Sequence, residues 1–182
     1  MERSDEDAFT GFVAETGGRL ARIAYLLVGG DRTAGEDLLQ GALERTYRHW
    51  SRVIRAGDAE AYVRRALVNA AINRRRRRFR EEPLEAAGPD GPVDRIDLGG
   101  SSAARDEIVR ALRTLPARQR AVVVLRYLDD LSEAETAAVL GCAVGSVKSQ
   151  ASRGLARMRA QMTSGDVAGD GDGSTRPTGR TR

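Results

Sequence analysis

The sequence of 182 residues contains very little cysteine and histidine, with a single Cys142 and a single His49. This scarcity excludes a disulfide framework, a zinc finger and other metal sites built from clustered cysteine and histidine, and it leaves few groups for nucleophile-and-base catalysis. No apolar run reaches the roughly 18 residues of a membrane span, and no signal peptide is apparent at the start. We therefore expect a cytoplasmic protein that is not an enzyme and carries no cofactor and no metal.

Charge is abundant, and its placement is more informative than its sum. The 30 Lys and Arg residues exceed the 26 Asp and Glu residues by only four, with a sequence pI near 9.8. The cations are concentrated, however: residues 74–78 are all arginine, and no acidic residue occurs from Val139 to Ser164. Concentrated positive charge favours an anionic partner.

The segment from Val144 to Arg159 has the pattern of an amphipathic helix. Its apolar residues recur at intervals of three and four, which places them on one stripe of a helix: Val144, Val147, Ala151, Leu155 and Met158. The opposite side is polar and basic and includes Ser149 and Arg153. Such a surface suits a polyanion, although the same pattern is typical of a solvated surface helix.

The residues just before this segment favour DNA binding. Ser132 and Glu135 have the spacing of a capping box that starts a helix, and Gly141 is suited to the left-handed conformation that ends one. A helix, a short glycine turn and a second helix form the helix-turn-helix motif, whose second helix enters the major groove. The two features together predict that the segment from Val144 reads DNA.

Two helices are predicted in the first 50 residues. The first spans 5–28, where Gly17 and Gly18 allow a break, and the second runs from Asp31, which can cap it, to about residue 50. One side of the second helix is acidic and polar, with the residues Glu36, Asp37, Gln40 and Glu44. Acidic residues near a helix start also favour its dipole, so these residues alone do not distinguish a partner surface from a favourable helix start.

A third helix is predicted from about Ala59 to Arg80, after a loop at 52–58. One of its faces combines an aromatic residue, two asparagines and two arginines: Tyr62, Arg65, Asn69, Asn73 and Arg76. Asparagine is a poor residue in a helix interior, and this set suits hydrogen bonding and stacking to nucleic-acid bases. The arginine run that follows could bind phosphates or form a solvated helix end.

The composition divides the chain into two helical domains. Residues 81–104 are acidic and rich in proline and glycine, which predicts a flexible linker between a first domain at 1–80 and a second at 105–162. Within the second domain, residues 121–128 are apolar enough for the central helix of a small bundle. The residues from 163 to 182 are expected to be a disordered tail. No strand is required, so the predicted fold class is all-α.

The sequence resembles the extracytoplasmic-function (ECF) sigma factors of the bacterial sigma-70 superfamily, most closely the short SigE-type branch. The resemblance covers about residues 9–159 and is most specific in three stretches, which occur in the family's order: GEDLLQGALERTYRHW (35–50), AYVRRALVNAAINRRRR (61–77) and LPARQRAVVVLRYLDDLSEAETAAVLGCAVGSVKSQASRGLARMR (115–159). The resemblance implies a dissociable subunit of RNA polymerase that selects promoters and opens their −10 DNA.

The resemblance also implies roles for particular residues. The first domain would correspond to region 2, whose second helix would bind core RNA polymerase through Asp37, Gln40 and Leu43. Its third helix would recognise and open the −10 element through Tyr62, Arg65, Asn69, Asn73 and Arg76. The second domain corresponds to region 4, which would read the −35 element through Lys148, Ser149, Ser152 and Arg153, with Arg126 on the DNA backbone. The linker would thread the polymerase cleft.

Some positions of the sequence depart from the family's usual pattern. Gly41 stands where relatives usually have an acidic residue, and Ala143 lacks the hydroxyl that could cap the recognition helix.

An autonomous helix-turn-helix regulator would leave the asparagine and arginine face unexplained. A nuclease would need clustered carboxylates to hold metal ions. The sequence does not decide whether an anti-sigma factor is a partner.

Overall fold

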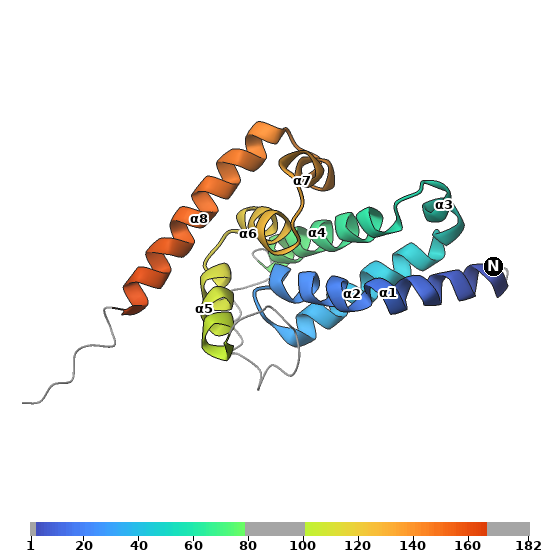
Figure 1. Cartoon of the computed structure of the whole chain (residues 1–182), viewed down its shortest axis with the longest axis horizontal. Coiled ribbons are helices and arrows are strands. Elements are labelled where there is room, and N and C mark those ends of the chain that lie inside the picture. Colours follow the sequence, from blue (N-terminus) through green and yellow to red (C-terminus); the bar gives the residue numbers. More distant parts are fainter. Residues whose placement is uncertain (1–2, 79–100, 167–182) are drawn as a thin grey trace, which may run out of the picture.

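The computed structural model describes residues 3–78 and 101–166, and within these ranges the chain is helical and contains no strand (Figure 1). The first range forms α1 (Arg3–Leu27), α2 (Arg32–Arg48), α3 (Trp50–Arg55) and α4 (Ala59–Arg78). The second forms α5 (Ser102–Arg113), α6 (Ala117–Val123), the π-helix η1 (Val124–Leu128), α7 (Glu133–Leu140) and α8 (Val144–Asp166). The predicted all-α fold is confirmed.

In the first domain α1, α2 and α4 pack on one another, and the turn between α1 and α2 depends on glycine. Helix α1 continues without a break through Gly17 and Gly18. It ends at Leu27, and the turn that follows contains Gly29 and Gly30, which adopt φ values of 80° and 82°, a region that favours glycine. Asp31 then caps α2 as predicted, because its Oδ1 accepts a hydrogen bond of 2.8 Å from the Ala34 amide.

The segment after α2 differs from the prediction. The second helix ends at Arg48, and residues 50–55, in part predicted to be a loop, form the short helix α3. Burial explains the difference, since Trp50 and Val53 are each only 3% exposed. The Trp50 ring lies edge-on to Phe9 of α1, with ring centroids 5.0 Å apart. Packing against a distant part of the chain therefore turns the backbone at His49 and keeps the next residues helical.

The second domain also begins and ends differently from the prediction. Helix α5 starts at Ser102 and is capped by Ser101, so part of the predicted linker is helical. The central helix starts at Ala117 rather than at 121 and finishes as the π-helix η1, whose last bond joins the Asp129 amide to the Val124 carbonyl. Helix α8 reaches Asp166, inside the predicted tail. The rest of the predicted linker and tail lies outside the described residues.

The predicted helix-turn-helix is confirmed in its local geometry. The Ser132 hydroxyl accepts a hydrogen bond from the Glu135 amide, and the Glu135 carboxylate accepts one of 2.7 Å from the Ser132 amide. Hydrogen bonding by the Ser132 side chain, and next by its backbone, holds the pKa of the Glu135 carboxyl below its ordinary value. This capping box is thus fully formed above the ordinary pKa of glutamate and weakens as the pH falls through the lowered value. Gly141 ends α7 with φ 61°.

Gly154 allows α8 to pack closely on α6. A Cβ atom added at Gly154 would lie 2.9 Å from Val123 Cγ2, whereas one added at Gly145 of the same helix would have no atom within 4 Å. We expect Gly154→Ala to lower the free energy of unfolding by about 1 kcal/mol, because overpacking outweighs the gain in helix propensity. Gly145→Ala should raise it by up to about 1 kcal/mol. Urea unfolding followed by circular dichroism measures both, and an equal gain in the two variants would contradict this packing.

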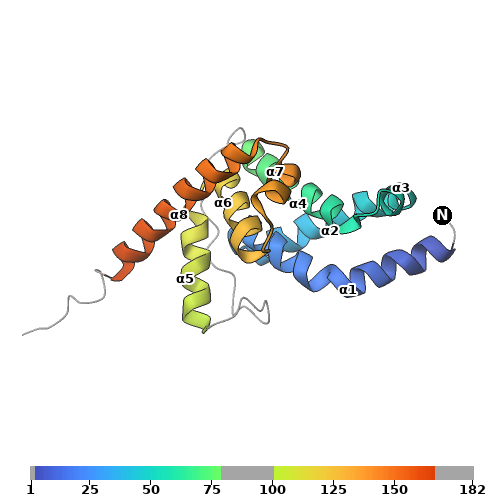
Figure 2. The ribbon, with the colours of Figure 1, turned by 45° about the horizontal axis from the view of Figure 1, so that its top comes forward.

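The two domains pack against each other, which the prediction of two tethered domains did not include. Helix α4 contacts α6 and α7, and α1 contacts α6 and η1 (Figure 2). Arg120, only 8% exposed, joins the domains because its guanidinium donates to the Leu27 carbonyl at the end of α1 and to three carbonyls in and just after the last turn of α5, those of Leu112, Arg113 and Leu115. The C-terminal ends of both helices carry partial negative charge, so they stabilise a buried cation.

Candidate nucleic-acid and polymerase interfaces

Helix α8 presents a polar, basic surface on the side opposite its packing contacts. Val147 and Ala151, 0% and 8% exposed, pack against the rest of the domain, as does the buried Gly154. Of the residues predicted to read DNA, Lys148, Ser152 and Arg153 are exposed, and Ser149 is half-buried with its hydroxyl donating to the Ser146 carbonyl. Val144 was predicted in the buried stripe, but it is 40% exposed because it opens the helix at the edge of the domain.

The charges on this surface are available to an anionic ligand. The Lys148 Nζ atom lies 3.5 Å from a Glu133 carboxylate oxygen of α7, but the two side chains are 65% and 39% exposed. An ion pair in water contributes at most about 1 kcal/mol, so a DNA phosphate can replace Glu133 at little cost. The hydroxyls of Ser149 and Ser152 and the guanidinium of Arg153 can form hydrogen bonds with base edges or phosphates.

Arg126 is held inside the second domain rather than extended into solvent. Its Nη1 donates a hydrogen bond to the Leu131 carbonyl, and its guanidinium lies 5.6 Å from the ring centroid of Tyr127. These contacts brace the turn between η1 and α7, while Tyr127 itself is 46% exposed. A role for Arg126 on the DNA backbone stays a prediction.

The predicted base-binding residues of α4 share one exposed face. Tyr62, Arg65, Asn69 and Asn73 are all exposed, whereas Val63 and Leu67 on the other side are fully buried. The backbone of Arg76 belongs to α4, but its side chain lies outside the described part. Arg65 Nη2 donates a hydrogen bond of 3.1 Å to the Ala138 carbonyl of α7, so the second domain reaches this face.

The acidic strip on α2 is exposed and is held only by weak surface contacts. Asp37 and Gln40 are exposed, and Leu43 is half-buried beside them. The Gln40 amide donates to Glu44, and an Asp37 oxygen lies 4.0 Å from an Arg74 nitrogen of α4. Since these pairs are solvated, the strip can exchange them for a partner's groups at low cost.

The described residues hold neither a candidate metal site nor a candidate membrane span. No group of three or more His, Cys, Asp or Glu side chains in residues 3–78 and 101–166 could hold a metal ion. No helix among these residues is both long and apolar enough to cross a membrane. Cys142 is a free, half-buried thiol in the turn before α8.

Comparisons with known proteins decide the family. Residues 12–81 match the family described as Sigma-70 region 2, and residues 105–158 match that described as Sigma-70, region 4. The chain belongs to the sigma-70 family. It is 39% identical to the RNA polymerase sigma-E factor of Streptomyces coelicolor over 138 residues, which covers 75% of this chain and 76% of the relative. The corresponding factor of Streptomyces avermitilis is 41% identical over 138 residues, 75% of each chain.

Solved structures show the same fold. The sigma factor RpoE of Bartonella quintana, solved in complex with the anti-sigma factor NepR, aligns with a TM-score of 0.71 and 23% identity over 86% of this sigma factor and 97% of that chain. CnrH, solved with the cytosolic domain of CnrY, aligns with a TM-score of 0.58 and 25% identity over 87% and 90%. The chain is thus an RNA polymerase sigma factor of the ECF class and SigE type.

Sequence patterns missed the residues that join the two domains of this sigma factor. Arg64 reads as one more surface arginine beside Arg65, and Asp129 as part of a solvated turn. In the structure these two side chains form a buried ion pair between α4 and the turn after η1. No periodic signal could reveal this pair, because the two residues are 65 positions apart.

Proposed function

We propose that this sigma factor works in the cytoplasm by joining core RNA polymerase to promoter DNA, with a separate helix for each contact. The observation that carries the proposal is the exposure of three chemically different surfaces: a basic face on α8, an asparagine and aromatic face on α4, and an acidic strip on α2. The chain supplies recognition and DNA opening, while core polymerase supplies the chemistry. Residues 1–80 would act as region 2 and 105–162 as region 4, joined by 81–104, with 163–182 as a tail.

Helix α8 would lie in the major groove of the −35 element. Lys148 and Arg153 bring positive charge to the phosphates and base edges, and Ser149 and Ser152 can donate or accept hydrogen bonds. Helix α7 would cross the backbone, as the first helix of this motif does. Arg126 would contact a DNA phosphate after its hydrogen bond to the Leu131 carbonyl is broken.

Helix α4 would hold the opened −10 strand. Unstacking a base costs a few kcal/mol per step, and stacking on an aromatic ring returns about 1–3 kcal/mol per base. Stacking of a base on the Tyr62 ring would therefore offset part of the cost of opening. Asn69 and Asn73 can form paired hydrogen bonds with the exposed edges of unpaired bases. Arg65 and Arg76 would hold the backbone of the same strand.

The acidic strip on α2 would bind core polymerase. We expect Asp37→Ala with Gln40→Ala to weaken binding to core polymerase at least tenfold, because both polar groups and the packing of Leu43 would lie inside the contact. Glu15→Ala, which removes a charge from the exposed side of α1, is the matched control. Fluorescence anisotropy with labelled protein and purified core measures the affinities. An affinity equal to that of the control would show that the acidic strip does not contact core polymerase.

An autonomous helix-turn-helix regulator is the rival function, and duplex binding distinguishes the two. If this chain acts as a sigma factor, it should bind a promoter duplex weakly alone and tightly with core polymerase, since two linked DNA contacts and the polymerase act together. A regulator would bind equally well without core. An anti-sigma factor is a further candidate partner, because RpoE of B. quintana was solved bound to one; co-purification from cells tests this.

A further inference from the structure

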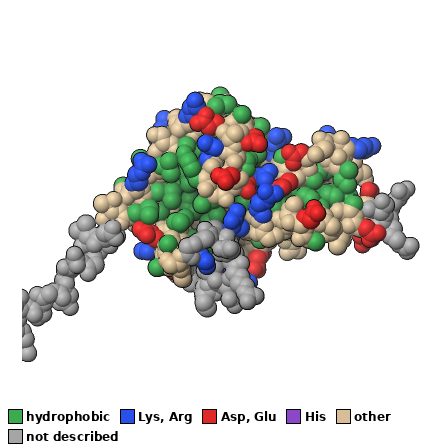
Figure 3. Space-filling view, in the orientation of Figure 1, with side chains coloured by type: hydrophobic (Ala, Val, Ile, Leu, Met, Phe, Trp, Pro, Cys, Tyr) green, Lys and Arg blue, Asp and Glu red, His purple; other side chains and the backbone are tan. Residues whose placement is uncertain are grey.

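A second concentration of arginine lies where α2 ends and α3 follows. Residues 45–57 contain four arginines and no acidic residue. The four side chains are all exposed and recur at intervals of three and four residues: Arg45, Arg48, Arg52 and Arg55. We call them the α2–α3 arginine patch. Figure 3 shows Lys and Arg side chains at the end of the first domain where α3 lies.

The patch arginines lack the partners that the other arginines of the first domain have. Within residues 5–74, every arginine outside the patch either pairs with a carboxylate or donates to a carbonyl of the second domain: Arg19, Arg32, Arg64 and Arg74 pair, and Arg22 and Arg65 donate. No carboxylate of the described residues pairs with a patch arginine. An anion can therefore bind the patch without breaking an ion pair.

Stabilisation of helix ends accounts for only part of the patch. Nε of Arg48 and of Arg55 donates to the carbonyl four residues earlier, at 3.4 and 3.0 Å. All four arginines lie in the last turn of a helix, where a cation interacts favourably with the helix dipole. That interaction acts on the charge alone. It leaves the N–H groups of Arg45 and Arg52 without a hydrogen-bond partner among the described residues.

Helix α3 is a rigid support for these side chains because it is anchored to α1. Trp50 and Val53 are each 3% exposed, and the ring centroids of Trp50 and Phe12 lie 5.3 Å apart. The Ser51 hydroxyl donates a hydrogen bond of 2.7 Å to Asp5. Cations on a rigid element bind an anion with less loss of conformational freedom.

The patch adjoins the end of α4 that carries Tyr62. A short turn at Gly57 joins α3 to α4, and the two helices contact each other (Figure 1). Tyr62 is 40% exposed in the first turn of α4. The arginine run at 74–78 ends the same helix. A strand held along α4 would therefore meet cations beyond both ends of the face that contacts its bases.

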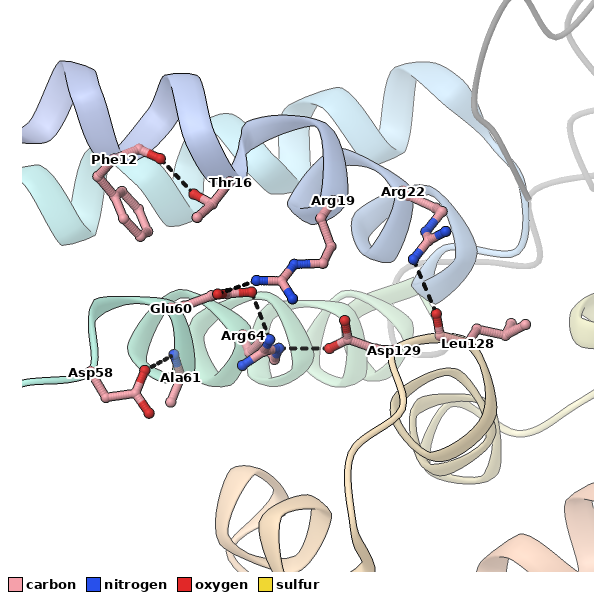
Figure 4. Close-up of polar contacts among 10 residues, drawn as sticks. All are labelled: Phe12, Thr16, Arg19, Arg22, Asp58, Glu60, Ala61, Arg64, Leu128 and Asp129. Carbon is pink, nitrogen blue, oxygen red and sulfur yellow. Dashed lines mark hydrogen bonds and ion pairs between the residues drawn. The ribbon is translucent and has the colours of Figure 1, made fainter. Parts of the chain in front are cut away.

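The acidic residues at the start of α4 are bound to groups of the protein itself. Figure 4 shows Glu60 between Arg19 of α1 and Arg64 of its own helix, and it forms ion pairs with both. Asp58 accepts a hydrogen bond of 2.8 Å from the Ala61 amide. These carboxylates thus leave the positive charge of the patch uncompensated.

We propose that the α2–α3 arginine patch binds phosphates of the unpaired DNA strand, beyond the bases that α4 contacts. Arg45 and Arg52 supply backbone contacts that do not depend on base sequence. This inference rests on the proposed role of α4 in holding that strand. Core polymerase is a less suitable partner, because a surface that complements the acidic strip on α2 is basic and would repel the neighbouring arginines.

The test removes two charges and measures the salt dependence of DNA binding. The variant is Arg45→Gln with Arg52→Gln, and the control is Arg110→Gln with Arg118→Gln, on exposed parts of α5 and α6. Holoenzyme made with each protein binds a labelled promoter fragment already unpaired at the −10 element. A phosphate contact to a single strand contributes about 0.7 to the slope of log affinity against log salt, so the variant should lose about 1.4 and the control nothing.

Neutral methylphosphonate linkages, placed one at a time in the unpaired strand, locate the contact. Wild-type holoenzyme should lose up to about fivefold in affinity at the contacted phosphates, whereas the variant should lose nothing more there. Arg45→Lys with Arg52→Lys keeps both charges and should restore the slope.

An unchanged slope, or equal sensitivity of variant and wild type to the neutral linkages, would overturn the proposal. Weaker binding of the variant to core polymerase in the absence of DNA would also overturn it, in favour of a polymerase contact. If wild-type holoenzyme does not prefer the unpaired fragment to the duplex, the proposed role of α4 is itself contradicted.

Discussion

Arg153→Ala is expected to reduce transcription from a promoter of this sigma factor at least tenfold while leaving its binding to core polymerase unchanged. Arg153 is exposed on the polar side of α8, with Gly154 buried next to it, so its loss removes a contact without disturbing the packing of the helix. A well-placed arginine contact to a base is worth about 1–3 kcal/mol, which corresponds to roughly 5–150-fold. Run-off transcription measures the effect when core polymerase is saturated with this protein and the holoenzyme concentration stays below the level that saturates the promoter.

The control for this prediction separates a lost base contact from lost charge. Arg159→Ala removes the same charge from an exposed position further along α8, outside the face that reads DNA. This substitution should lower transcription only by the small amount that comes from weaker general attraction to DNA phosphates. On a template with a scrambled −35 element, wild-type protein and Arg153→Ala should give equal, low transcription. If Arg153→Ala lost as much on the scrambled template as on the intact one, α8 would not be reading that element.

Combined Asn69→Ala and Asn73→Ala should abolish most transcription from duplex promoters, with a loss of more than tenfold, yet retain activity on a template already unpaired at the −10 element. Both side chains are exposed on α4, one turn apart. Their hydrogen bonds to unpaired bases would offset the few kcal/mol that unstacking costs, so removing them should penalise opening more than binding. Permanganate reactivity of unpaired thymines measures opening directly.

The unpaired template is the internal control for this pair of substitutions. The same protein, polymerase and −35 element are present on both templates, and only the cost of opening differs. Alanine also has a higher helix propensity than asparagine, so the helix itself should be no less stable. An equal loss on duplex and unpaired templates would show that the asparagines serve polymerase binding or folding rather than opening.

Local interactions were predictable from the sequence because they depend on residues close in the chain. Ser132 and Glu135 form their capping box and Gly141 takes its left-handed conformation, as their types and spacing require. The exposed face of α4 follows from helical periodicity alone, since every third or fourth residue lies on the same side. These features account for the placement of the residues predicted to contact DNA.

Features that depend on distant residues were not predictable. The short helix α3 exists because Trp50 packs on Phe9 and Phe12 of α1, some forty residues earlier in the chain. Val144 has the spacing of a buried residue, yet it lies at the open edge of its domain. The pair of Arg64 and Asp129 depends on how two domains meet, and no pattern within either domain contains that information.

The most direct measurement is transcription in vitro from fragmented chromosomal DNA of the source organism, using purified core polymerase with and without this protein. Sequencing of transcript 5′ ends should reveal a set of defined start sites that appear only when the protein is present, each preceded by shared −35 and −10 elements. If the protein binds duplex DNA tightly but start sites are the same with and without it, the chain does not direct initiation.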